Sequence, residues 1–177
     1  MTGKPRSFAS ASRIASIAAF LTLVTFGNIT DYDTNFAFVE HVIAMDTIFP
    51  TSTIAYRAIT NPVFHHVAYQ SIIAFQAVVS LMCWAGVFRL LRHFRDDPAI
   101  FNGAKNIVTA GLILAFLLYQ FGFVTIGGEW FGMWMSQQWN GVPSAFRFLM
   151  TIIAVLIFVA LPDAELARKS HTRGQHP

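Results

Sequence analysis

Four long stretches without charged residues divide this chain, and they limit it to very few folds. They are Ile14–Thr30, Val67–Phe88, Asn106–Gly128 and Phe148–Pro162. A helix needs about 20 mostly apolar residues to cross a bilayer. The second and third stretches are long enough alone. The first reaches that length if Ser12 and Arg13 extend it into the interface, and the fourth if it begins near Pro143 with Arg147 in its first turns. The sequence therefore predicts four transmembrane helices.

The composition also favours an integral membrane protein. Of the 177 residues, 55% are hydrophobic and only 12% are charged, whereas soluble domains carry about 25% charged residues. We therefore expect one membrane domain over residues 13–163, between an irregular amino-terminal arm (1–12) and a tail (164–177). No small-residue cleavage site follows the first stretch, so we expect that stretch to be retained.

The distribution of basic residues predicts the orientation in the membrane. Ten of the twelve Lys and Arg residues lie before the first stretch, between the second and third, or after the fourth, and only Arg57 and Arg147 lie elsewhere. The positive-inside rule then places both termini and the central gap in the cytoplasm. Because these basic residues flank apolar stretches, they do not indicate binding of nucleic acid. The two external gaps hold the acidic residues Asp31, Asp33, Glu40, Asp46 and Glu129.

The first external gap contains a helical pattern. Asp33 or Thr34 can cap a helix, and Phe36, Val39, Val42 and Ile43 follow at helical spacing. This pattern predicts a short amphipathic helix on the bundle or in the interface, ended by Phe49-Pro50. The predicted fold is an all-α four-helix transmembrane bundle with both termini cytoplasmic and a short amphipathic helix in the first external loop.

The second external gap predicts a surface for a partner or a lipid. Three tryptophans lie within ten residues, interleaved with glycines. Tryptophan is typical of the membrane interface, but it is also enriched at docking surfaces, and a quinone-like or lipid head-group pocket is a further possibility. A charge near a bilayer is unfavourable unless it pairs or reaches the interface, so we expect Arg147 either to pair with Asp31, Asp33 or Glu129 or to extend to the interface. The predicted surface comprises Asp31, Glu129, Trp130, Trp134, Trp139 and Arg147.

The external histidines offer a metal or haem site as an alternative. The candidate ligands are His41, His65, His66 and Glu40. The two adjacent histidines project about 100° apart on a helix and do not easily share one ion. The first, third and fourth stretches contain no histidine, which argues against a haem held between helices at mid-membrane. The sequence assigns no cofactor, and these histidines can equally hydrogen-bond to loops.

Other chemistry has little support in the sequence. It contains no phosphate-binding loop, nucleophile elbow or zinc-protease helix motif. Polar residues within the stretches are sparse and are expected to hydrogen-bond between helices rather than to line a transport path. They are Gln70, Ser71, Gln76, Ser80, Tyr119 and Gln120.

The loop motifs carry a resemblance to a known family. They are Asn28-Ile29-Thr30-Asp31-Tyr32, His41, Met45-Asp46-Thr47, Gly128-Glu129-Trp130-Phe131 and Trp139-Asn140-Gly141. With these motifs the chain resembles a bacterial family of predicted small integral membrane proteins with a domain of unknown function. The resemblance implies a four-span protein of the bacterial inner membrane and brings no known activity or functional residues.

Three functional hypotheses follow. The leading one is a non-catalytic accessory or binding subunit of a membrane complex that acts through its external loops. The partners would be the lipid bilayer and another membrane subunit or a second copy of the chain. The first alternative is a metal- or haem-binding redox protein that uses the external histidines. The second is a small transporter, which would need to oligomerise to build a path.

Overall fold

All the regular secondary structure in the described part of the chain is helical. The computed structural model describes residues 4–161 except 94, 95 and 97. In chain order the helices are α1 (Lys4–Thr30), α2 (Tyr32–Ala44), the short η1 (Ala55–Arg57), α3 (Pro62–Arg92), α4 (Pro98–Ala104), α5 (Asn106–Leu117), the wide η2 (Leu118–Trp130), the short η3 (Met133–Met135) and α6 (Val142–Ala160). The predicted carboxy-terminal tail lies outside the described residues.

Four helical segments of this part are long and apolar enough to cross a membrane, which confirms the predicted all-α architecture. They are Ala11–Thr30, Pro62–Arg92, Ile100–Trp130 and Val142–Ala160. The fourth carries Pro143 in its first turn and includes Arg147, as its length required.

Several boundaries differ from the prediction. Helix α1 begins at Lys4, so most of the expected irregular arm is helical. Helix α3 begins at Pro62, because the Asn61 side chain accepts a hydrogen bond from Val63 N at 2.9 Å and proline suits the first helical position. The short helix α4, which includes Asn102 and Gly103, was not predicted.

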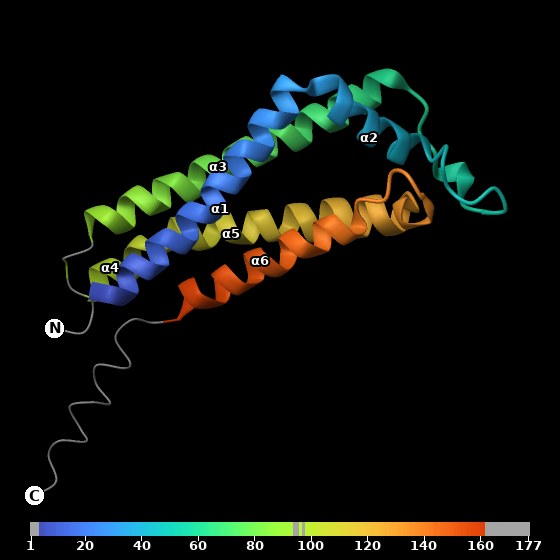
Figure 1. Cartoon of the computed structure of the whole chain (residues 1–177). Helices are drawn as coiled ribbons and strands as arrows, with labels where there is room; N and C mark the ends of the chain where they lie inside the picture. Colours follow the sequence, from blue (N-terminus) through green and yellow to red (C-terminus); the bar gives the residue numbers. More distant parts are fainter. Residues whose placement is uncertain (1–3, 94–95, 97, 162–177) are drawn as a thin grey trace, which may run out of the picture.

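The helices form two layers that approach closely at one end (Figure 1). Helix α1 packs mainly on α3, and α5 packs on α3 and α6. The closest approach of α3 and α5 is at Gly86, where an added Cβ would lie 1.8 Å from Val108 Cγ2. At Gly111 the corresponding contact is to Cys83 Sγ at 3.3 Å. Small residues allow helices to approach in this way within a membrane. Toward α2 the two layers separate (Figure 1).

Polar side chains join α1 to α3, as predicted for Gln76 and Ser80. Ser80 Oγ and Thr22 Oγ1 are 2.8 Å apart, and Trp84 Nε1 donates to Thr22 Oγ1 at 3.0 Å. Asn28 Nδ2 donates to Gln76 Oε1 at 2.8 Å. Such bonds contribute about 0.6–2 kcal/mol each between membrane helices.

Helix α2 lies across the end at which the two layers separate (Figure 1). Its N-cap residue is Asp31, two residues before the earlier of the two predicted caps, and Met45 ends it in the left-handed conformation with φ of 53°. Val39, Val42 and Ile43 are buried, and α2 packs on α3. The helix therefore forms a wall between the loops and the membrane helices.

The third membrane helix changes its hydrogen-bond pattern halfway. After α5 it continues as η2, a helix with i→i+5 hydrogen bonds. Phe131 N donates to Ile126 O at 3.0 Å, and Thr125 Oγ1 donates to Gln120 O at 3.0 Å. Segments of this type are rare and occur often at functional sites.

Candidate functional site

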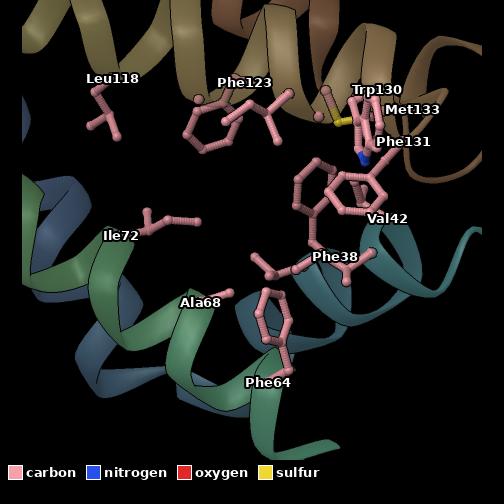
Figure 2. A pocket seen from close by; sticks show the side chains of 15 residues that line it. Phe38, Val42, Phe64, Ala68, Ile72, Leu118, Phe123, Trp130, Phe131 and Met133 are labelled. Carbon is pink, nitrogen blue, oxygen red and sulfur yellow. The ribbon is translucent and has the colours of Figure 1, made fainter. Parts of the chain in front are cut away.

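An apolar cavity of about 510 Å³ lies between α2, α3 and η2 (Figure 2). Its walls are hydrocarbon and aromatic rings, and no charged residue lines it. Helix α2 contributes Phe38, Val39, Val42 and Ile43; α3 contributes Phe64, Ala68 and Ile72; η2 and the turn after it contribute Leu118, Gly122, Phe123, Ile126, Gly127, Trp130, Phe131 and Met133.

Helix η2 supplies a large part of the wall. Leu118, Gly122, Ile126 and Trp130 line the cavity at intervals of four residues. Phe123, Gly127 and Phe131, each one residue farther along the chain, line it as well. One continuous side of the segment therefore faces the cavity. Gly122 leaves space open, because an added Cβ would contact only Leu118 Cδ1, at 3.8 Å.

The rim of the cavity is formed by exposed apolar side chains. Phe64 is 46% exposed, Ile126 is 38% exposed and Trp130 is 53% exposed. All three belong to segments long and apolar enough to cross a membrane. In a bilayer, the surroundings of this rim are therefore hydrocarbon or the interface rather than bulk water.

A smaller compartment of about 300 Å³ adjoins this cavity. The two share Phe38, Val39, Ile72 and Phe123 as walls. Unlike the apolar cavity, the smaller compartment is lined by several uncharged polar side chains. These are Asn28, Asn35, Tyr69, Gln76, Tyr119, Asn140 and Ser144. The two spaces together thus have an apolar part and a polar part.

Several polar groups of the polar compartment on α1, α2 and α3 have partners in the protein. Tyr69 OH donates to the Asn28 carbonyl at 3.0 Å, and the Asn28 side chain donates to Gln76. Asn35 Nδ2 donates to the Asp31 carbonyl at 2.8 Å.

The opposite wall contains paired groups and one unpaired hydroxyl. Asn140 Oδ1 accepts from Val142 N at 3.1 Å, and Ser144 Oγ accepts from Arg147 Nη2 at 3.0 Å. The Tyr119 hydroxyl, in contrast, has no hydrogen-bond partner among the described residues, although Tyr119 is only 3% exposed. A buried polar group without a partner is uncommon and costly.

The three predicted loop tryptophans each contact the segment between α2 and α3 or α2 itself. The Arg57 guanidinium lies 4.8 Å from the Trp130 ring centroid, and Arg57 Nη1 donates to the Trp130 carbonyl at 3.2 Å. Trp134 packs edge-on against Phe49 at 5.9 Å. The third, Trp139, stacks on His41 of α2 at 4.6 Å. The tryptophans therefore join the two loops, while Trp134 remains 47% exposed.

The charged residues of the predicted surface do not form the expected ion pair. Arg147 donates to Ser144, and within the described residues it makes no ion pair with Asp31, Asp33 or Glu129. Asp31, Glu129 and Arg147 are all exposed. The reason is that an exposed arginine at a helix end can reach the interface and does not require a counter-charge.

The predicted metal ligands occupy separate places. His41 Nδ1 lies 2.6 Å from Asp46 Oδ2. His66 Nδ1 lies 3.0 Å from the Tyr32 hydroxyl, and its ring stacks on Phe36 at 4.1 Å.

His65, the third predicted histidine, is buried at the start of α3. Its Nε2 donates to the Ile59 carbonyl at 2.6 Å, and its Nδ1 lies 3.8 Å from Glu40 Oε1. In the part of the chain that the structure describes, no three His, Cys, Asp or Glu side chains come close enough to hold one metal ion.

Sequence reasoning did not identify the cavity. The sequence signals of the cavity were Gly122, Gly127 and the polar residues within the apolar stretches. Those polar residues were assigned to hydrogen bonds between helices. That assignment holds for Gln76 and Ser80 but not for Tyr119.

The comparison with protein families gives one match. The family described as predicted small integral membrane protein (DUF2165) matches residues 6–162. The chain belongs to this family. The match includes all four membrane segments and both loops of the site, and it confirms the resemblance carried by the loop motifs. No curated protein and no solved structure matches the chain significantly. The family description states membrane integration and names no activity.

Proposed function

We propose that this family member is a non-catalytic binding protein of the membrane that holds one hydrocarbon chain of a lipid-like ligand. The observation that carries the proposal is the apolar cavity of about 510 Å³ between α2, α3 and η2. Its volume lies within the range of about 300–1,000 Å³ that is typical of ligand pockets.

The lining and the surroundings both favour a hydrocarbon chain. Water would find almost no hydrogen-bonding partners in a space lined by Phe38, Phe64, Ile72 and Phe123. Lipid chains would be the molecules nearest to the rim at Phe64. A chain that enters the cavity exchanges contacts with other lipids for contacts with fixed rings, and close packing of this kind is the main source of attraction inside a membrane.

The same site supports an accessory role in a membrane complex. The cavity wall at Trp130 continues into the loop surface at Trp134, and both side chains are about half exposed. A ligand in the cavity would therefore contact the elements that a partner subunit would meet. In this proposal the loops lie on the external side of a bacterial inner membrane and both termini lie in the cytoplasm. The supports are the distribution of basic residues and the bacterial family that the loop motifs resemble.

The test is ligand retention and binding after purification in mild detergent. We expect native mass spectrometry of the wild-type protein to show one retained lipid-like molecule. Gly122→Leu should fill the cavity and lower the retained fraction at least about tenfold, because a leucine occupies space that a chain would use. The matched control is Gly27→Leu, since an added Cβ at Gly27 of α1 meets no atom within 4 Å and the residue does not line the cavity.

Other results would point elsewhere. Equal retention by Gly122→Leu and Gly27→Leu, or no retained molecule and no uptake of an added alkane by the wild type, would refute the proposal. Stoichiometric metal or a visible absorption band in the same sample would favour the histidine-based redox alternative. Flux through reconstituted vesicles would favour the transporter alternative.

A further inference from the structure

The polar compartment contains a buried hydroxyl that nothing in the described protein satisfies. The Tyr119 ring is fixed by Phe123, with centroids 5.6 Å apart, and by Phe148, with centroids 5.4 Å apart. Tyr119 lines the compartment, and its buried hydroxyl has no hydrogen-bond partner among the described residues. Because the ring is held on two sides, the hydroxyl is not free to turn toward another protein group.

A second donor group lines the same compartment. Gln76 accepts the Asn28 hydrogen bond through Oε1. Its Nε2 group makes no hydrogen bond to the described residues, and Gln76 is only 2% exposed. Tyr119 OH and Gln76 Nε2 are both donors, so the group that suits them is an oxygen acceptor.

The compartment favours an uncharged ligand group. None of its lining residues carries a charge at neutral pH. Arg147 does not line the compartment; it is exposed and donates to Ser144, one of the lining residues. A phosphate inside the compartment would be a buried charge without a partner, which is strongly unfavourable.

We infer that the polar compartment is a head-group subsite for a neutral carbonyl or ether oxygen, bound by Tyr119 and Gln76, while the attached chain occupies the apolar cavity. This inference rests on the proposed function, and the shared walls at Phe38, Val39 and Phe123 supply the continuity that one ligand needs. Neutral lipids with such an oxygen include a quinone with an alkyl tail and a diacylglycerol.

The test compares head groups on the full-length protein in detergent. The assay is competition against a brominated alkane that quenches tryptophan fluorescence. The competitors are decane, a decyl-substituted benzoquinone, dioctanoylglycerol and decyl phosphate. We expect the wild type to prefer at least one carbonyl-bearing competitor to decane, and the better of the two distinguishes a quinone from a glycerolipid.

The Tyr119→Phe variant isolates the hydroxyl. It should reduce the preference for the carbonyl head about 2- to 10-fold, the effect of one neutral hydrogen bond, and leave the affinity for decane unchanged. The control is Tyr56→Phe, because Tyr56 is 79% exposed and does not line either space.

The outcomes separate the two proposals. If the wild type binds decane but shows no preference for a carbonyl head, or prefers decyl phosphate, the head-group inference is wrong while chain binding stands. A preference that Tyr119→Phe does not reduce also refutes it. If no competitor, including decane, displaces the brominated chain or if that chain does not bind, both proposals fail. The wild-type comparison decides these cases even if Tyr119→Phe does not fold.

Discussion

Substitution of Gly86 by alanine tests how the closed end of the helix bundle is built. An added Cβ would lie 1.8 Å from Val108 Cγ2, 3.0 Å from its Cβ and 3.3 Å from its Cα. Carbon atoms in contact are normally about 3.5–4.0 Å apart. A new rotamer of Val108 would relieve only the first contact. The backbones of α3 and α5 must therefore move apart.

The expected cost follows from two opposing effects. Overpacking of a filled core costs about 1–3 kcal/mol, and the contact to backbone places Gly86→Ala near the upper limit. Alanine in place of glycine stabilises a helix interior by about 1 kcal/mol. The net loss in the free energy of unfolding should be about 2 kcal/mol. It should shrink when Val108→Ala is added, since the clashing methyl groups are then absent.

Reversible unfolding in mixed micelles, titrated with a denaturing detergent, measures this difference. The matched control is Gly27→Ala, where the new Cβ meets no atom within 4 Å, so that variant should be unchanged or slightly more stable. If Gly86→Ala is as stable as the wild type, or if Val108→Ala does not reduce the loss, α3 and α5 do not approach as described.

Three further substitutions test the loops and the α1–α3 contact. Arg57→Ala should lower the free energy of unfolding by about 1–2 kcal/mol, because it removes the cation–π contact and the hydrogen bond to Trp130. It should also speed amide hydrogen exchange in both loops, and unchanged exchange would contradict this. His65→Ala should lower the free energy of unfolding by about 1–3 kcal/mol in the same titration, because the Ile59 carbonyl loses its donor. The loss should exceed that of His66→Ala at the exposed neighbour, and the reverse order would refute the buried hydrogen bond of His65. Gln76→Leu should cost about 0.6–2 kcal/mol in the same assay by removing the hydrogen bond to α1, and a stabilised variant would show that this bond is not formed.

The four membrane segments could be predicted because a long apolar run can be recognised in the sequence alone. An apolar run of sufficient length crosses a bilayer regardless of its neighbours. The need for Pro143 and Arg147 inside the fourth segment followed from length alone. Boundaries were less predictable, since α1 extends into polar sequence and the short α4 contains Pro98, Asn102 and Gly103, which are more typical of turns.

The cavity could not be predicted because it depends on distances between helices. Ala68 and Ile72 read as ordinary membrane-facing residues, and no sequence rule indicates that α3 and η2 separate beside them. The change from α5 to the wider η2 also leaves no clear sequence mark, although Gly122 and Gly127 lie within it. Of the two arrangements expected for Arg147, the structure has the exposed one, because an arginine at a helix end is solvated without a counter-charge.

The closed and open ends of the bundle are related in physical terms. At Gly86 the absence of a side chain lets α3 contact α5. Toward α2, the continuation of α5 as η2 lies apart from α3, and the apolar cavity lies between them. Two straight helices in tight contact at one end and apart at the other need a third element to hold the separation. Phe38 of α2 takes this place: it lines both spaces and packs against Gly141, where an added Cβ would lie only 2.7 Å from its ring. Helix α2 is therefore part of the cavity, and Phe38 joins the loop at Gly141 to the walls of both spaces.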